Sequence, residues 1–599
     1  MNASDPMILQ VDLSDRTIVR RDPAPYAARF AGGRGVGSKI LYDALKPGVD
    51  PLGPENVLVF NTGLLSGTAA PAAGRTDVSA KSPLNGYHGV TNFGGFWGAE
   101  LSQAGYHHVV FTGASEEPVY LRIENDRVKL CDARHLWGLD TYATMRQLRR
   151  EMGDEDVQVI AVGPAGENGV RYASINASMG DAAGRMGMGA VMGAKKLKAV
   201  VVRGTRGIRL HDPGRFLELA RDTHKFLRDS ATFQNFAVSK AKGDPMFSPK
   251  AHDDMPFGNF EAGAWENFQH LEAEKFFLKH QIRRTGCFGC PLQCMHLVQV
   301  PGADYGLSHC MNFQSLLGTV WNDDLNTMWE AIVLVNKYGL DAHETGGILA
   351  LLMELYAEGV ITAEDTDGIA MERGRREAIL PMIHKIARRE GIGAILAEGP
   401  VRAAQAIGRR AEDYVVAAKG LFPHGYAFQV VEGTSLMQAV SSGEPFQTYG
   451  TGIERTIDPR NPDPRLMAQA EALYGSPEAY LPGNYSPAKV RMVIDAEHRS
   501  RVPDLLGVCL TSIVYVLKTI PDVHFLYDRL ADLVHAATGR PLSRLELFAA
   551  AERLVNLERC LDAREGLQRG DDTLPPRFFR PFDSGMHRGK ALDPEKLEA

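Results

Sequence analysis

The 599-residue sequence lacks the features that mark membrane and secreted proteins. It has no run of about 18 apolar residues, the length that a membrane-spanning helix needs. Its longest apolar stretch, 505–517, is interrupted by Thr511 and Ser512. The N-terminus carries acidic residues where a signal peptide has a basic start and an apolar run. We therefore expect a cytoplasmic protein that does not associate with membranes.

Positive charge and cysteine are also scarce. Lys and Arg total 66 against 73 for Asp and Glu, which gives a formal net charge of −7, and there is no long basic run. Nucleic acids and anionic surfaces bind clustered Lys and Arg, so neither is an expected partner. Seven cysteines in a large chain of this type favour metal or redox chemistry over a disulfide framework.

Glycine, in contrast, is abundant, and the pattern of the chain changes along its length. The 61 glycines are about 10% of the residues, above the usual ~7%, which suggests backbone packed against a large ligand. Short β-type runs fill the first part, whereas apolar residues at three- and four-residue spacing follow from Pro213. We predict an α+β protein with a β-rich domain at 1–208 and two mainly helical domains at 209–420 and 421–599. The expected strands include 7–11, 57–61, 108–112, 119–123, 157–162 and 199–202, and the expected helices include 216–226, 328–336, 345–358, 378–389 and 543–567.

Four cysteines form one pattern. Cys287, Cys290 and Cys294 lie on a short Gly/Pro turn with C-x-x-C-P-x-x-C spacing, and Cys509 lies far downstream. Three thiolates on one turn plus a remote fourth are typical of a 4Fe–4S cluster. The alternative is a structural zinc site, but zinc sites usually have two C-x2–4-C pairs. The spacing therefore favours the cluster.

The other cysteines are less informative. Cys131 follows a strand-like run, and Cys560 falls on an apolar stripe with Leu554, Leu557 and Leu561, so both are expected to be core thiols. Cys310 lies in no such pattern and remains a candidate for chemistry.

Three glycine-rich elements stand out. The first, 32–39, matches neither a phosphate-binding P-loop nor a dinucleotide fingerprint, and we expect a tight turn that opens a helix. The other two, 63–98 and 183–196, combine close-approach glycines with Arg75 and Arg185, respectively. A guanidinium can bind phosphate through two parallel hydrogen bonds. These two elements predict one large phosphate-bearing ligand, or two.

Taken together, these motifs resemble the tungsten-containing aldehyde:ferredoxin oxidoreductase family over nearly the whole chain. The resemblance implies a tungsten ion, or molybdenum in its place, held by the dithiolenes of two pterins, with Mg²⁺ bridging the pterin phosphates. It also implies a 4Fe–4S cluster bound by the four cysteines above. The N-terminal β domain would form a base for the pterins. Within the glycine-rich elements, the resemblance assigns pterin binding to Arg75, Asn92, Gly94, Ala183, Gly184 and Arg185.

The helical part resembles the family in a paired motif, D-x-x-G-L-D and D-x-x-G-L-C, with one copy for each pterin. Here the copies span Asn336–Asp341 and Asp504–Cys509, and the first begins with Asn instead of Asp. That exchange weakens one expected pterin hydrogen bond. Cys509 belongs both to its motif and to the cluster, which implies that cluster and pterin are neighbours. The resemblance assigns pterin contacts to Asn336, Leu340, Asp341, Asp504 and Val508.

The chain departs from the aldehyde-oxidising members in two places. The stretches 306–313 and 433–445 stand where those members carry a carboxylate and a His near the metal, and neither is visible here. In the related tungsten benzoyl-CoA reductases, a Cys in the first region ligates tungsten. We therefore treat Cys310 as a candidate tungsten ligand, with a buried free thiol as the alternative. His252 and His309 are candidate proton donors, with surface or structural histidines as the alternative.

Two functions follow from the resemblance. The first is oxidation of an aldehyde to a carboxylic acid with ferredoxin, or a ferredoxin-like subunit, as electron acceptor. The second is reduction or dehydrogenation of an acyl-CoA, with Cys310 on the metal and the chain in a larger complex. The absence of a flavin or nicotinamide fingerprint supports a separate electron-transfer protein. A homodimer or a larger complex is expected, and a purely structural cluster would leave the two pterin elements unexplained.

Overall fold

The computed structural model describes residues 7–599 except Met179, Thr232, 235–254, His309, Tyr426, 443–453, 455–456 and 518–523. The strands in these residues form three sheets. Two six-stranded sheets make up the N-terminal region, with the orders β2-β1-β6-β3-β4-β5 and β11-β10-β9-β12-β7-β8. The first contains β1 (Met7–Asp12), β2 (Thr17–Arg21), β3 (Leu58–Thr62), β4 (Thr76–Lys81), β5 (His88–Phe93) and β6 (Tyr106–Thr112), and the second contains β7 (Val119–Glu124), β8 (Arg127–Asp132), β9 (Gln158–Ala161), β10 (Ile175–Ala177), β11 (Asp181–Ala183) and β12 (Leu197–Arg203).

Two short helices pack against both sheets. They are α3 (Trp97–Gln103) and α6 (Met188–Ala194), and each contacts strands of either sheet. The indole N–H of Trp97 donates to the carbonyl of Val200 in β12, at 3.2 Å, which ties α3 to the second sheet. The remaining helices of this region are α1 (Ala24–Phe30), α2 (Gly33–Ala44), α4 (Thr141–Met152) and α5 (Pro164–Glu167).

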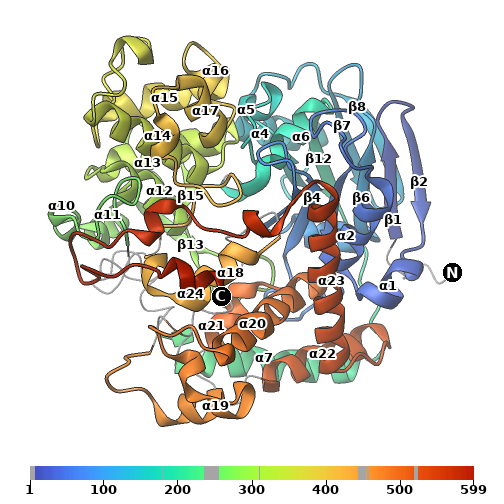
Figure 1. Ribbon diagram of the computed structural model, residues 1–599. Coiled ribbons are helices and arrows are strands. Elements are labelled where there is room, and N and C mark those ends of the chain that lie inside the picture. The colour runs from blue at the N-terminus through green and yellow to red at the C-terminus, as the bar shows by residue number, and fades with distance from the viewer. Residues whose placement is uncertain are drawn as a thin grey trace.

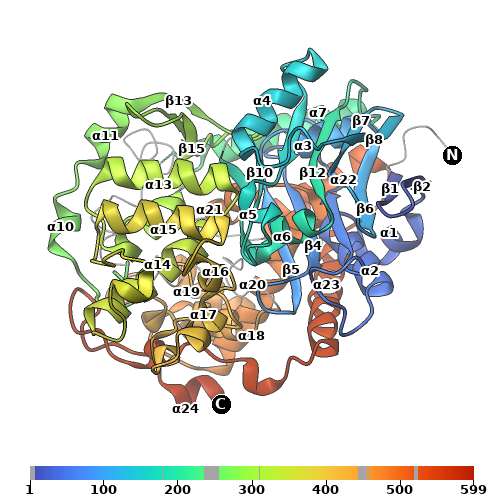
Figure 2. The same ribbon diagram turned by 90° about the horizontal axis from the view of Figure 1, so that it is seen from above.

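The helical region lies beside and below these sheets (Figure 1). In Figure 2, α13, α14 and α15 lie side by side next to the N-terminal region. The upper group of helices comprises α10 (Glu266–Gln269), α11 (Ala273–His280), α12 (Cys310–Leu316), α13 (Leu325–Tyr338), α14 (Ala342–Ala357), α15 (Arg376–Arg388), α16 (Gly393–Leu396) and α17 (Pro400–Ile407). The lower group comprises α18 (Glu432–Val440), α19 (Pro464–Tyr474), α20 (Pro487–Leu506), α21 (Leu510–Leu517), α22 (His524–Thr538), α23 (Arg544–Arg564) and α24 (Pro594–Glu598).

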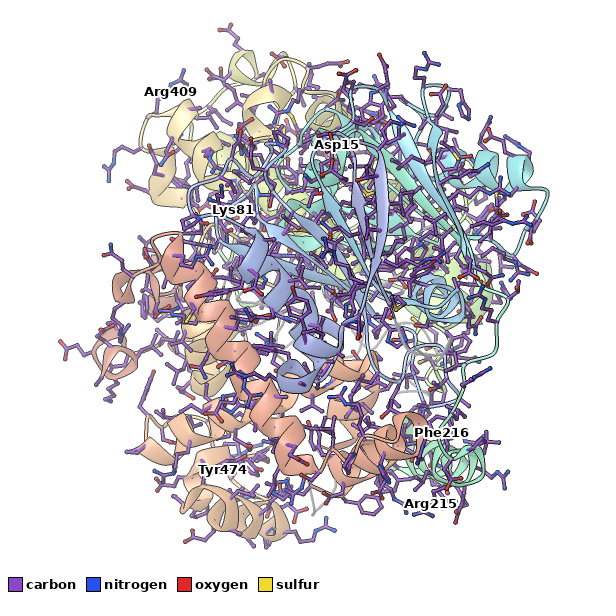
Figure 3. The ribbon with its side chains drawn as sticks, turned by 90° about the vertical axis from the view of Figure 1, so that its right-hand side faces the viewer. Asp15, Lys81, Arg215, Phe216, Arg409 and Tyr474 are labelled. Atoms are coloured by element: carbon purple, nitrogen blue, oxygen red, sulfur yellow. The ribbon has the colours of Figure 1, made fainter. Side chains whose placement is uncertain are left out.

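Residues far apart in sequence share one apolar core in the lower part. Helix α7 (Pro213–Asp229) packs on α22, and Phe216 is fully buried in a cluster with Leu506 and Leu530. Figure 3 labels Phe216 and Tyr474 in this lower part, and Lys81 beside α23. The Lys81 ammonium pairs with Glu565 at 2.5 Å, which fixes the end of α23 to the first sheet. Helix α23 therefore packs against the N-terminal region.

The structure confirms the predicted α+β class and the predicted strands and helices. It also adds a three-stranded antiparallel sheet in the region expected to be helical, formed by β13 (Gln281–Thr285), β14 (Met295–Val298) and β15 (Gly306–Ser308). These strands have five, four and three residues, which is too short to show a clear two-residue alternation. Among the described residues, no helix has both the length and the apolar character needed to cross a membrane.

Candidate cofactor site

The cysteine turn is the loop of a β-hairpin. Cys287, Cys290 and Cys294 lie between β13 and β14, whose pairing ends with Thr285 opposite Met295. Backbone hydrogen bonds attach this loop to the N-terminal region: Phe288 donates to Gly95 O at 2.9 Å, and Ala72 donates to Gly289 O at 2.9 Å. Cys509 in turn donates to Ala72 O at 3.1 Å. The hairpin loop, the N-terminal loops and the remote fourth cysteine therefore meet at one place.

The four cysteines are close enough to influence one another. Burial raises the pKa of the Cys287 thiol, and Asp181, Cys294 and Cys290 raise it further. Burial and the nearby Cys509 likewise raise the pKa of Cys290. Among the described residues, however, no three His, Cys, Asp or Glu side chains converge on the position of a single metal ion. The cysteines therefore lie near one another, and their binding of a 4Fe–4S cluster stays a prediction.

Gly94 and Asp181 line this neighbourhood on the N-terminal side. A Cβ atom at Gly94 would clash with the Cys287 sulfur and would also crowd Arg75. The Gly94 N–H donates to Asp181 Oδ1 at 3.3 Å. Only glycine therefore lets the backbone after β5 approach the cysteines this closely.

Arg75 connects the cysteines to the first sheet. Its Nε donates to Asn92 Oδ1, and Asn92 Nδ2 donates to Asp77 Oδ1 at 2.7 Å. Burial opposes the charge of Arg75, but Cys509, Cys287 and Asp181 outweigh it and hold the guanidinium pKa above its usual value. Arg75 is thus a permanent cation. On one side of it lie the thiols, which would become thiolates on binding a cluster, and on the other lie the polar ends of β4 and β5.

The second copy of the paired motif ends α20 beside these groups. Gly507 adopts a φ of +73°, and a Cβ at Gly63 would clash with the Gly507 backbone. Leu65 donates to Leu506 O at 2.9 Å, and Arg75 donates through its backbone to Gly507 O at 3.1 Å. The loop before β4 is therefore pressed against the motif that supplies Val508 and Cys509.

A buried ion network holds Asp504, the first residue of this motif. Arg34 binds Glu558 through two hydrogen bonds, at 2.7 and 2.9 Å, and Asp504 Oδ2 through a third at 3.0 Å. Burial and the nearby Asp504 raise the pKa of Asp77 well above its usual value. The predicted helix-opening turn at 32–39 is confirmed as the start of α2. A Cβ at Gly33 would clash with the Asp504 carbonyl, so the glycine serves close packing.

The first copy of the motif ends α13 on the other side. Gly339 has a φ of +71°, and its carbonyl accepts from Ser174 N–H at 2.8 Å. Leu340 forms a bridge with Ala173, and Asp341 donates to Tyr172 O at 3.0 Å. These contacts place the motif against the segment that leads into β10, close to the second glycine-rich element.

Arg185 of that element reaches the first motif. Its guanidinium lies 3.1 Å from Glu344 Oε1 and 3.5 Å from Asp341 Oδ2, and it donates to the Phe422 carbonyl at 2.9 Å. Burial raises the pKa of Asp341, and Arg185 counteracts this rise. Ala183 is fully buried at the end of β11.

Several features of this region fit a large heteroatom-rich ligand. In the described part of the chain, Asn336 Nδ2 and Asp341 Oδ2 are buried without a hydrogen-bond partner. A Cβ at Gly184 would meet nothing within 4 Å, so space remains next to the arginine that follows it. A pterin, which carries ring nitrogens, a carbonyl and a phosphate, would satisfy an amide donor, a carboxylate acceptor and a guanidinium together.

The described structure also brings together two histidines that sequence reasoning missed. His343 Nε2 and His424 Nδ1 are 3.1 Å apart, and His343 Nδ1 is 2.6 Å from Ser315 Oγ. The signal in the sequence was weak, because 81 residues separate the two histidines, although His343 lies only two residues after the end of the first motif. Asp77, Asp181, Arg34 and Glu558 were missed for the same reason: their partners are distant in sequence.

The predicted catalytic residues are only partly covered. Cys310 is the first residue of α12, and only its backbone is described. His309 and His252 lie outside the described residues, so their roles stay predictions. The prediction of core thiols is wrong for Cys560, which is exposed, and Cys131 is only half-buried.

Nearly the whole chain is similar to known proteins. Residues 8–204 match the family described as aldehyde ferredoxin oxidoreductase, N-terminal domain, and residues 218–599 match its domains 2 and 3. The tungsten-containing aldehyde ferredoxin oxidoreductase of Pyrococcus horikoshii is 34% identical over 98% of this chain and 93% of its own length. An aliphatic sulfonate oxidoreductase, WOR-like subunit, of Pyrococcus furiosus is 29% identical over 100% of this chain and 93% of its own length.

One solved structure is similar in fold and in sequence. It is the active-site complex BamBC of benzoyl coenzyme A reductase with 1,5-dienoyl-CoA, which matches with a TM-score of 0.83 and 28% identity. The match covers 99% of this chain and 93% of that chain. On the strength of these matches, the chain belongs to the aldehyde ferredoxin oxidoreductase family, a family of oxidoreductases with tungsten-containing members that implies a tungsten–pterin cofactor.

Proposed function

We propose that this chain oxidises aldehydes to carboxylic acids at a tungsten bis-pterin site and passes the electrons through a 4Fe–4S cluster to ferredoxin. The observation that carries the proposal is the position of Arg75. It touches Asn92 on the first sheet, and its charge is sustained by Cys509 and Cys287. One side chain thereby links the expected cluster ligands to the expected pterin base.

The cofactors would be distributed over three groups of residues. Cys287, Cys290, Cys294 and Cys509 would bind the cluster. Molybdenum would be accommodated by the same ligands as tungsten, and Mg²⁺ would bridge the pterin phosphates. The pterins and their phosphates would be held by Arg75, Asn92, Gly94, Ala183, Gly184, Arg185, Asn336, Leu340, Asp341, Asp504 and Val508.

The overall reaction joins an aldehyde and water to give a carboxylic acid, two protons and two electrons. When bound, the tungsten centre supplies the two-electron redox step. The protein must orient the carbonyl, release the protons, and conduct the electrons one at a time toward the surface. The four cysteines would hold the cluster that supplies this electron transfer, and Arg75 would lie beside it, since Cys509 belongs to both the motif and the cysteine group.

An electron-transfer partner can approach at the cysteine hairpin. Gly289 and Gln293 of this loop are exposed. Phe96, whose side chain is 43% exposed, packs edge-on against Phe288 with ring centroids 6.2 Å apart. An exposed aromatic residue beside the cluster ligands suits a small apolar contact with ferredoxin or a ferredoxin-like subunit. The similarity to a subunit of a benzoyl-CoA reductase complex and to a WOR-like subunit supports a larger assembly, with a homodimer as the alternative.

Reduction or dehydrogenation of an acyl-CoA is the second candidate function. It is favoured by the structural similarity to the benzoyl-CoA reductase complex. It is also favoured by the resemblance to that branch, which makes Cys310, the first residue of α12, a candidate tungsten ligand. In that case the electrons would enter through the cluster and leave on the substrate.

Metal analysis and tungsten-edge X-ray absorption on anaerobically purified protein test both functions. The wild type and Cys310→Ser are compared, and each is assayed with aldehydes plus ferredoxin and with acyl-CoA substrates. Four sulfur ligands plus oxygen, unchanged in Cys310→Ser, with aldehyde turnover, support aldehyde oxidation. A fifth sulfur that disappears in Cys310→Ser assigns the chain to acyl-CoA chemistry. Protein that retains iron but holds neither tungsten nor molybdenum overturns both proposals.

A further inference from the structure

A short line of hydrogen bonds joins helices α12 and α14 to the loop that contains His424, next to the first motif. Ser315 on α12 is 2.6 Å from His343 Nδ1 on α14, and His343 Nε2 is 3.1 Å from His424 Nδ1. The two rings meet edge to face with centroids 4.5 Å apart. Ser315, His343 and His424 are 2%, 8% and 6% exposed, respectively, so this line is shielded from bulk water.

The two histidines of this line can share one proton. Two imidazole nitrogens at hydrogen-bond distance need one donor and one acceptor, so a single proton lies between His343 and His424. The other nitrogen of His343 faces a hydroxyl that can donate or accept. A proton added at one end can therefore leave at the other when each group exchanges its roles. Burial and like-charge repulsion disfavour charging both rings at once.

The histidine pair adjoins the groups that anchor the first pterin. The His343 backbone N–H donates to Asp341 Oδ1 at 2.8 Å. Phe422, two residues before His424, donates its N–H to Glu344 and accepts from Arg185 through its carbonyl, each at 2.9 Å. The pair is thus built into the ion-pair cluster of the first motif.

The charged and titratable groups around the pair come from each element packed on it. Asp341 and Glu344 belong to the motif and to α14, and Arg185 comes from the N-terminal region. Tyr172 faces the two carboxylates, which together with burial raise the pKa of its phenol well above its usual value. Two carboxylates and one guanidinium therefore surround the histidine pair.

We propose that Ser315, His343 and His424 form the proton relay of this active site, in place of the Glu and His that the aldehyde-oxidising relatives are expected to carry. The inference rests on the proposed function, because the net reaction releases two protons for every two electrons. The relay takes up one proton when the metal is reduced and passes it on when the metal is reoxidised, so it consumes no further reactant. It lies at the first motif, whereas Arg75 and the cysteines lie at the second. The proposed proton relay and the proposed cluster ligands therefore lie at different motifs.

The test compares the tungsten-loaded wild type with His424→Gln, His343→Gln and Ser315→Ala. A matched control is His384→Gln, which changes a half-buried histidine on α15 that bonds to the Tyr338 hydroxyl at 2.7 Å. The first readout is the pH dependence of the tungsten midpoint potential, followed by electron paramagnetic resonance during a redox titration. The second is the pH profile of kcat and KM, and tungsten and iron contents are measured for each protein.

If the relay takes up a proton when the metal is reduced, the wild-type potential falls as pH rises, and His424→Gln and His343→Gln flatten this dependence. In both variants kcat should fall by about 100-fold or more with little change in KM. Ser315→Ala should lower kcat less, because the histidine pair survives. A full pH dependence of the potential in both histidine variants would overturn the relay, even if their metal content were reduced. Wild-type protein without tungsten or molybdenum would instead overturn the proposed function, so the two failures are distinguishable.

Discussion

The two copies of the paired motif end their helices in the same way and are anchored differently. Gly339 and Gly507 both adopt a φ slightly above +70°, which turns the chain after α13 and α20. The first turn is bonded to the segment Tyr172–Ser174, and the second is pressed against the loop 63–75. The two turns therefore have the same local conformation but contact different segments of the N-terminal region.

The residues beside each turn determine which side chains and ion pairs the motif contacts. At the first motif, Asp341 leads into His343 and the ion pairs of Arg185. At the second, Cys509 joins the thiols, and Asp504 joins the buried network of Arg34. The comparison teaches that the histidine pair lies at one motif and the thiols lie at the other. We call the buried network of Arg34, Asp504, Glu558 and Arg501 the second anchor, because it holds the second motif in place. The following predictions test the separation of the two motifs and the contribution of the second anchor to stability.

The largest effect is expected from Cys509→Ser, which removes the thiol shared by the second motif and the cysteine group. We expect loss of the iron–sulfur cluster and a fall in activity of at least about 100-fold, beyond what changes around a metal site's ligands usually cost. Iron and sulfide content and the cluster's electron paramagnetic resonance signal measure the change. The control is Cys560→Ser, because Cys560 is exposed on α23. A Cys509→Ser protein with full iron content would remove Cys509 from the proposed ligands.

Glu558→Gln should be the most destabilising single change in the second anchor. Glu558 is fully buried, receives two hydrogen bonds from Arg34, and lies 3.7 Å from Arg501. Removing one partner of a buried ion pair leaves an uncompensated charge and typically costs about 3–5 kcal/mol. Urea unfolding of the variant should show this loss.

The matched control for that experiment is Glu552→Gln, an exposed carboxylate on the same helix. It should change the free energy of unfolding by less than about 0.5 kcal/mol. Equal losses in the two variants would mean that the charge of α23, and not the buried network, supports the fold.

The same network predicts an acid-dependent loss of stability. Burial alone would raise the pKa of Glu558, but Arg34 and Arg501 outweigh it and lower the pKa to about 2. Above the ordinary value near 4.5 both states are ionised, and the stabilisation is complete. Between pH 4.5 and 2 only the unfolded chain binds the proton, so about 3 kcal/mol of this stabilisation is lost as pH falls. Unfolding curves across this range should lose that component of the pH slope in Glu558→Gln, whereas an unchanged slope would contradict the lowered pKa.

Sequence reasoning predicted those parts of the molecule that depend on local pattern. The cysteine turn, both motifs and the two glycine-rich elements each occupy a short segment, and the structure places them around one region. The contacts between segments could not be predicted, because Arg34 and Glu558 are 524 residues apart in sequence. The histidine pair likewise depends on the packing of α14 against the segment after Phe422.

Cys560 shows why an apolar pattern can point to the wrong face of a helix. The buried stripe of α23 runs through Leu547, Leu554 and Leu561, but it also includes the charged Glu558. A prediction that counts only apolar residues leaves out Glu558 and therefore places the buried face of the helix too close to Cys560, which is exposed. The buried charge is the feature that makes this helix part of the second anchor.

The smallest predicted effect belongs to Asp504→Asn, which makes the second motif begin like the first. Arg34 would lose one hydrogen bond to a carboxylate, at 3.0 Å, but would keep both bonds to Glu558. We expect a loss of about 1–2 kcal/mol in urea unfolding, together with easier loss of tungsten on dialysis if Asp504 contacts a pterin. Because Asn336 already stands at the equivalent position of the first motif, the fold tolerates an amide there. A loss as large as that of Glu558→Gln would mean that Asp504 is the main partner of Arg34, and that the second anchor depends on the motif itself more than on α23.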